Sequence, residues 1–153
     1  QQCEAAAAFF GQTSLRAVEL EQLLAAEGKL DSLSFRRARH ILTENIRTLT
    51  AADALAAGDL SGLIKVMVES HASMRDDFNI TTPAIDTLVN ILVEAGAGDA
   101  GARMTGGGFG GCVVAVAPAV VIPQLMAAVD AQYHAQTGCV PTLIRAKASA
   151  GAF

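Results

Sequence analysis

The amino-acid sequence predicts an α+β fold in which helices pack on a small antiparallel sheet. Apolar residues recur at helical spacing up to about residue 96, and short β-branched runs follow. Hydrophobic residues make up 52% of the 153 positions and charged residues 17%, so the chain can form a core. Aromatic residues account for only 5% and alanine is abundant, which favours a helix-rich core. The length fits one domain covering residues 1–153.

The N-terminal part is expected to hold one helix and a loop. Residues 1–11, QQCEAAAAFFG, are typical of a helix because alanine is the best helix former. Residues 11–34 are expected to form a loop that contains a short helix over residues 18–26.

A helical hairpin is predicted next. A long helix begins near Phe35 and ends at Gly58. Its inward face is expected to be Phe35, Ala38, Leu42, Ile46, Leu49, Ala52 and Ala56. Asp59 is suited to cap the second helix. The inward face of that helix is expected to be Leu60, Leu63, Ile64, Met67, His71 and Met74.

The remaining elements alternate between helix and strand. A helix begins at Thr82-Pro83 and ends before Gly96. Two strands, residues 102–105 and 113–116, flank a glycine-rich loop. A further helix over residues 119–136 is ended by Gly138. A last strand is expected over residues 142–147, because Leu143 and Arg145 alternate with Ile144 and Ala146.

The glycine-rich loop is the most informative stretch. Five of the six residues from Gly106 to Gly111 are glycine, which allows backbone N–H groups to approach a ligand without interference from Cβ atoms. The alternative is a mobile hairpin loop without a ligand. A dinucleotide-binding turn is excluded because a strand rather than a helix follows, and a Walker loop is excluded because no Gly-Lys-Ser/Thr follows.

Three segments resemble the galactokinases of the GHMP kinase superfamily. They are MTGGGFGGCVVAV from Met104, ESHASMRDDF from Glu69 and RARHILTEN from Arg37, and the similarity covers nearly the whole chain in the same order. The resemblance implies a GHMP kinase C-terminal domain, with helices on a small antiparallel sheet of ferredoxin-like type. It also implies that the chain is a C-terminal fragment of a larger kinase.

The resemblance implies transfer of the γ-phosphoryl group of ATP, bound with Mg²⁺, to the 1-hydroxyl of galactose. It places Gly106, Gly107, Gly108 and Gly110 beside the phosphates and the sugar, in a cleft shared with the protein's own N-terminal domain. The catalytic Asp and the main phosphate loop of the family have no counterpart in this sequence. The chain alone is therefore expected to be inactive and to contain no catalytic residue.

The helix that Asp59 is expected to cap offers weaker candidates for the site. His71 and Arg75 lie four residues apart and can share a cleft-facing side. The structural interpretation is favoured, with His71 as a hydrogen-bonded core histidine and Arg75 at a solvated helix end. Asp76 and Asp77 are not assigned as a general base.

Charge and cysteine content narrow the class of protein. The net charge is −4, which argues against nucleic-acid binding. The basic group Arg36, Arg37, Arg39, His40 and Arg47 is interpreted as a solvated helix face. Neither a metal cage nor a membrane span is expected. The scattered Cys3, Cys112 and Cys139 indicate reduced thiols in the cytoplasm, and no leader is visible at Gln1.

Three alternatives remain open at this point. The chain can belong to another GHMP small-molecule kinase, although ESHASMRDDF argues against this. It can come from a non-catalytic relative that binds galactose and ATP and signals through a protein partner. It can also be an autonomous scaffold with a flexible glycine hairpin. A fragment is further expected to self-associate through apolar surface meant for the missing domain.

Overall fold

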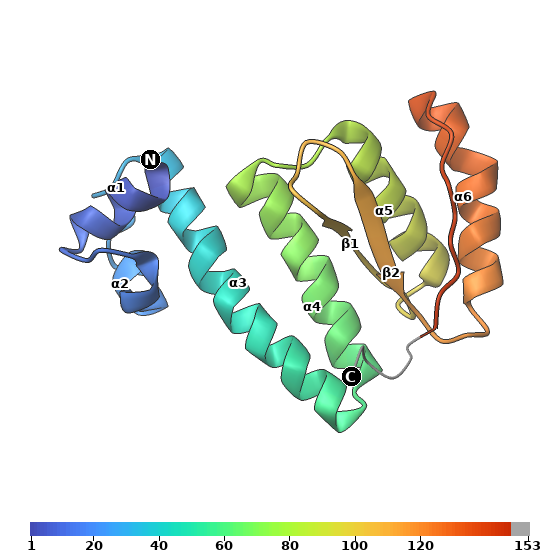
Figure 1. The fold of residues 1–153 in the computed structure, drawn as a ribbon, viewed down its shortest axis with the longest axis horizontal. Helices are drawn as coiled ribbons and strands as arrows, with labels where there is room; N and C mark the ends of the chain where they lie inside the picture. Colours follow the sequence, from blue (N-terminus) through green and yellow to red (C-terminus); the bar gives the residue numbers. More distant parts are fainter. Residues whose placement is uncertain (148–153) are drawn as a thin grey trace, which may run out of the picture.

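Helices pack against a two-stranded antiparallel sheet in the computed structural model, which describes residues 1–147 (Figure 1). The chain is therefore an α+β domain, as the sequence predicts. Its elements in order are α1 (Gln2–Phe9), η1 (Leu15–Ala17), α2 (Leu20–Leu24), α3 (Ser32–Ala57), α4 (Leu60–Ser73), the π-helix η2 (Met74–Phe78), α5 (Pro83–Gly96), β1 (Gly101–Thr105), β2 (Cys112–Val116) and α6 (Ile122–Thr137).

The helix boundaries follow from capping residues that the sequence identifies. Gly58 ends α3 in the left-handed region, with φ +68°, and Gly138 ends α6 in the same way, with φ +72°. Asp59 caps α4 by accepting the Gly62 N–H at 2.9 Å. Thr82 caps α5, with Pro83 at its first turn. The apolar pattern does not predict the beginning of α3, because Asp31 caps this helix ahead of the first apolar position.

The sheet is a hairpin, and α4 covers the outer edge of β1. Residues Gly101 and Thr105 of β1 pair with Val116 and Cys112 of β2. A Cβ atom at Gly101 would lie only 2.8 Å from the Cα of Ile64, so glycine permits the close approach of α4 to β1. Helices α5 and α6 pack together beside the sheet (Figure 1). Their buried side chains, including Val89, Leu92, Leu125 and Val129, form one core cluster with Ala102 of β1.

The predicted inward face of α3 is wrong in its second half. Ala38 and Leu42 are buried against α1 and η1, but Ile46 and Leu49 are 50% and 69% exposed, and Ala54 is buried instead. The reason is that α3 has neighbours on two sides. The N-terminal helices lie against one side of its beginning, and α4 lies against the other side along its length (Figure 1).

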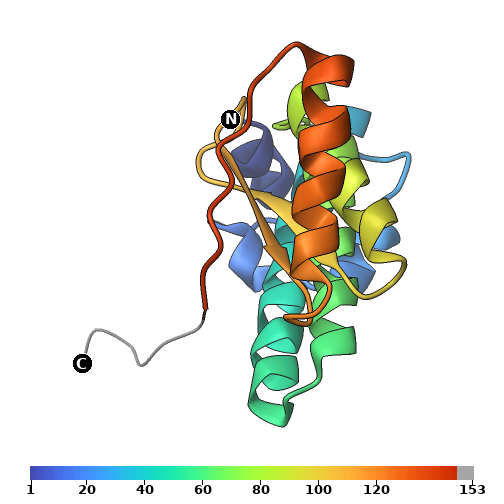
Figure 2. The ribbon, with the colours of Figure 1, turned by 90° about the vertical axis from the view of Figure 1, so that its right-hand side faces the viewer.

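The predicted strand over residues 142–147 is absent. The segment is extended beside α6 (Figure 2), but residues 140–147 make no backbone hydrogen bond to the rest of the described chain. Ile144 is 85% exposed. A cavity of about 610 Å³, lined by both β2 and residues 140–146, lies between this segment and β2. An alternating sequence cannot form a strand without an adjacent edge to pair with.

Candidate functional site

The loop between β1 and β2 needs glycine for its backbone conformation. Gly106, Gly108, Gly110 and Gly111 have φ angles of +103°, +88°, +132° and +102°. L-amino acids with a side chain rarely adopt such angles, so the glycine run is a requirement of the hairpin geometry. Phe109 also has a positive φ, +59°, and is the one non-glycine residue of the loop.

The loop offers unused hydrogen-bond donors. Within residues 1–147, the backbone N–H groups of Gly106, Gly107, Gly108 and Gly110 donate to no protein acceptor. A Cβ atom built at Gly106, Gly107 or Gly110 would meet nothing within 4 Å. The four residues predicted as the phosphate-proximal loop are therefore together, and three of them border open space. Such donors can hold an anion without a fixed positive charge.

The tip of the loop is anchored to the segment that follows η2. The Phe109 N–H donates to the carbonyl oxygen of Ile80 at 2.6 Å. A Cβ atom at Gly108 would lie 2.9 Å from the Cβ of Ile80, so this glycine is needed for contact as well as for φ. The ring of Phe109 remains 75% exposed. This anchoring argues against a freely mobile hairpin.

His71 lies under the beginning of the loop rather than at the surface. It is 2% exposed, with Nε2 3.1 Å from Oδ1 of Asp86, and its Nδ1 is 3.3 Å from the backbone nitrogen of Met104. Burial lowers the pKa of His71 from its ordinary value, although Asp86 acts in the opposite direction. The imidazole is therefore a neutral, hydrogen-bonded core group, as the structural interpretation of the sequence expects.

Arg75 is a surface residue in the π-helix η2. Its side chain is 41% exposed and its Nε lies 2.8 Å from Oδ1 of Asp76. The hydrogen bond to Asp76 raises the pKa of Arg75 and lowers that of Asp76, so both are charged. This arrangement is a solvated ion pair of small energetic value.

The basic group at the beginning of α3 is not a solvated face, contrary to the prediction. Arg39 forms an ion pair with Asp77, and Arg37 donates to the backbone carbonyl of Asp77. His40 is 6% exposed, with Nδ1 2.9 Å from Oγ of Ser73. These contacts join residues 33 to 40 positions apart, and helical spacing in α3 alone cannot reveal them. They tie η2 to α3.

His40, Ser73 and Asp77 have the composition of a hydrolase triad but not its geometry. The Ser73 hydroxyl donates to Asp77 at 3.2 Å and lies between the two other groups. In a triad, histidine lies between serine and aspartate and removes the serine proton. Ser73 is also only 7% exposed, so no substrate reaches it. The cluster is structural.

A second polar cluster joins α3 to α4 and β1. Glu44 accepts from Nε of Arg47 at 2.5 Å and from the Ser70 hydroxyl at 2.8 Å, and Nη1 of Arg103 lies 3.7 Å away. Burial raises the pKa of Glu44, but these hydrogen bonds and cations together hold it below its ordinary value. Glu44 is therefore an ionised anchor.

The described residues show neither a metal cage nor a membrane span. No group of three or more His, Cys, Asp or Glu side chains within residues 1–147 is arranged to hold a metal ion. No helix among the described residues is long and apolar enough to cross a bilayer. Cys3, Cys112 and Cys139 are unpaired in the described structure.

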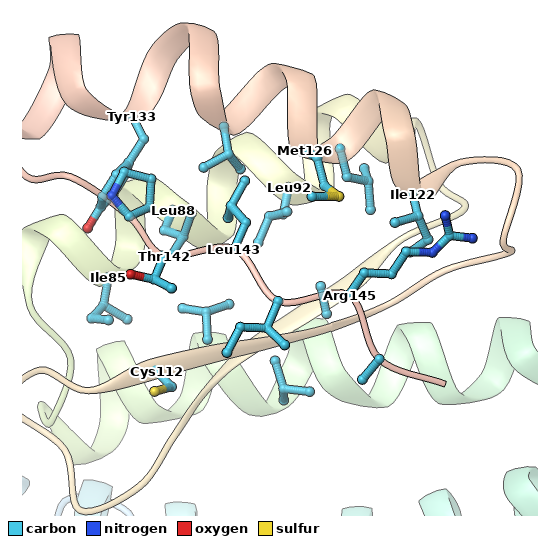
Figure 3. Close-up of a pocket in the computed structure, with 18 of the residues that line it drawn as sticks. Ile85, Leu88, Leu92, Cys112, Ile122, Met126, Tyr133, Thr142, Leu143 and Arg145 are labelled. Atoms are coloured by element: carbon cyan, nitrogen blue, oxygen red, sulfur yellow. The ribbon is translucent and has the colours of Figure 1, made fainter. Parts of the chain in front are cut away.

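The cavity of about 610 Å³ lies beside the glycine loop, of which Gly111 is the one residue among those that line it. It is bordered by α5, α6, β2 and the extended C-terminal segment, and Leu92, Met126 and Leu143 are among the side chains around it (Figure 3). Most of the side chains around it are apolar, and Arg145 lies at one end (Figure 3). It lacks the convergent polar groups that a sugar phosphate requires. The loop, rather than this cavity, is the candidate site.

Comparison with known proteins identifies the fold. The family model described as GHMP kinases C terminal matches residues 51–135, which is more than half of the chain. The crystal structure of Lactococcus lactis galactokinase complexed with galactose superposes with a TM-score of 0.80 at 32% sequence identity. The match covers 90% of this chain and 37% of that galactokinase. The chain therefore belongs to the GHMP kinase family and has the fold of its C-terminal domain.

Proposed function

We propose that this chain is the C-terminal domain of a galactokinase, which transfers the γ-phosphoryl group of ATP to the 1-hydroxyl of galactose. The observation that carries the proposal is the row of unused N–H donors at Gly106, Gly107, Gly108 and Gly110. The similarity to a galactokinase that binds galactose supports the choice of sugar.

In this proposal the loop stabilises negative charge during phosphoryl transfer. The bond between the γ-phosphorus and the bridging oxygen breaks while a bond to the sugar oxygen forms, and charge accumulates on the phosphoryl oxygens. Backbone N–H groups that are already fixed in place can donate to these oxygens without reorganisation. Mg²⁺ enters with ATP as part of the substrate, and the described residues supply no carboxylate cage for it.

The rest of the machinery lies in the protein's own N-terminal domain, according to the same proposal. The chain spans about 37% of the length of the galactokinase that it matches. The resemblance assigns the catalytic Asp and the main phosphate loop to the remaining part. The chain alone is therefore an inactive single domain that acts in the cytoplasm as part of a larger enzyme.

The isolated domain is expected to self-associate. Leu49 and Leu55 of α3 are 69% and 66% exposed, and Val140 and Ile144 of the C-terminal segment are 83% and 85% exposed. Exposed aliphatic side chains in such number favour association in water. Sedimentation of the isolated domain as a monomer at high concentration would contradict this part of the proposal.

A coupled ADP-release assay tests the proposal. The full-length protein is assayed with MgATP and galactose, glucose or mevalonate, and the isolated domain is assayed in parallel. We expect turnover of galactose by the full-length protein and none by the isolated domain. Preference for mevalonate or glucose would assign another small-molecule kinase. Calorimetric binding of galactose and ATP without ADP release would assign a non-catalytic sensor.

A further inference from the structure

The edge of β1 that faces α4 is held by a side chain. Met104 is opposite Val113 of β2, and its N–H donates to Nδ1 of His71, 3.3 Å away. Met104 is fully buried, and no water can replace this acceptor without opening the core. His71 therefore supplies the hydrogen-bond acceptor that a neighbouring strand would otherwise supply. Met104, which it holds, lies two residues before the glycine loop begins.

Only one tautomer of His71 fits these contacts. Nε2 lies 3.1 Å from a carboxylate oxygen of Asp86, which can only accept, so Nε2 carries the proton. Nδ1 then has the lone pair that accepts the Met104 N–H. Asp86 is itself oriented by the Thr81 hydroxyl at 3.2 Å and lies in the first turn of α5, where a negative charge is favourable.

The loop has a second attachment from the same part of the chain. Ile80 accepts the Phe109 N–H, and Ile80 directly precedes Thr81. One hydrogen bond thus fixes the strand before the loop, and another fixes its tip. Between these two points lie Gly106, Gly107 and Gly108, whose N–H groups have no protein acceptor in the described structure.

We propose that His71 is a positioning residue for the glycine loop and that Asp86 sets the tautomer it needs. His71 touches no substrate in this proposal. It holds Met104, and through Met104 it sets where the loop donors lie. The effect on catalysis rests on the proposed function, whereas the attachment of the loop to His71 does not.

Two substitutions at the same position separate positioning from packing. In His71→Asn, the side-chain oxygen can take the place of Nδ1 and accept the Met104 N–H. In His71→Gln, the longer side chain places its amide group near Asp86, where Nε2 of histidine lies. The Met104 N–H then loses its acceptor. A third variant, Asp86→Asn, can donate to Nε2 and thereby favour the tautomer that has a proton on Nδ1. His134→Gln, at an exposed histidine of α6, is the control.

The readouts are amide hydrogen exchange over residues 104–111, the ¹⁵N shifts of His71, and galactokinase kinetics, all on the full-length protein. We expect His71→Gln and Asp86→Asn to speed loop exchange and to lower kcat by roughly 10-fold to 100-fold, because small misplacements of positioned groups have effects of that size. His71→Asn should keep more of the activity than His71→Gln at a similar melting temperature. The control should match the wild type.

Several results would overturn the proposal. They are a proton on Nδ1 of His71 in the wild type, unchanged loop exchange in His71→Gln, or equal losses in the Asn and Gln variants. If the wild-type protein has no galactokinase activity but His71→Gln still speeds loop exchange, the proposed function fails and the attachment of the loop stands. If the wild type is active and His71→Gln retains its kcat, the positioning role fails alone.

Discussion

Gly107 is the position where binding of a ligand by the loop can be separated from folding. It is the glycine of the loop that has no positive φ angle, and a Cβ atom there would meet nothing within 4 Å. Gly107→Ala should therefore leave the free energy of unfolding unchanged to within about 0.5 kcal/mol. If stability is unchanged, a loss of activity in this variant comes from neither backbone strain nor a steric clash.

The same substitution should damage the proposed reaction. The added methyl group occupies the open space from which a phosphate would approach the N–H group. Loss of one preorganised donor of this kind lowers kcat by about 10²-fold, which corresponds to roughly 2.7 kcal/mol of transition-state stabilisation. We expect a loss of that order in kcat/KM in Gly107→Ala of the full-length protein.

A matched control separates the effect from glycine replacement in general. Gly98, in the turn after α5, has φ +97°, and a Cβ atom there would likewise meet nothing within 4 Å. Gly98→Ala should lose about 1 kcal/mol of stability through backbone strain and keep its kcat. The assay is ADP release over a range of galactose concentrations, which gives kcat and kcat/KM, together with thermal unfolding. Wild-type kcat/KM in a fully folded Gly107→Ala variant would refute the role of the loop.

Three further predictions concern stability. Gly101→Ala should destabilise the domain by about 1–3 kcal/mol in denaturant unfolding, because the new methyl group would press on the backbone of α4 at 2.8 Å. Asp77→Ala should cost about 1–3 kcal/mol by the same method, because it leaves Arg39 without its partner, and an unchanged midpoint would contradict the anchoring of η2. Burial lowers the native pKa values of His40 and His71 from 6.5, so the unfolded chain binds more protons, and stability should fall as the pH drops below about 6.5. The melting temperature is measured at pH 5 and pH 7 in the wild type and in a variant with both His40→Gln and His71→Gln. A difference between the two pH values in the wild type but not in the variant would assign the effect to these histidines.

Local chemistry is enough to predict the order of the helices and strands up to α6, and where the glycine loop lies between the two strands. Helix ends depend on neighbouring residues only, so a short stretch of sequence predicts them. Gly58 adopts the left-handed conformation that ends α3, and the side chains of Asp59 and Thr82 accept backbone N–H groups at the beginnings of α4 and α5. The glycine run likewise permits positive φ angles, which the structure has at Gly106 and Gly108.

The features that sequence patterns missed depend on the arrangement in space. Arg39 and Asp77 are 38 positions apart, and their pairing requires α3 to lie against η2. The buried side of α3 changes at Ile46 because its neighbours change there. Residues 142–147 alternate like a strand, but a cavity separates them from β2, and they make no backbone hydrogen bond to it. Tertiary contacts decide each of these cases.

The most direct test of the central claim is hydrogen exchange of the loop in the full-length protein, with and without galactose and a magnesium complex of a non-hydrolysable ATP analogue. The amides of residues 106–110 are expected to become protected only when both ligands are present, because their N–H groups then donate to phosphate or sugar oxygens. Exchange that is unchanged in an enzyme that turns over galactose would contradict the assignment of this loop as the site.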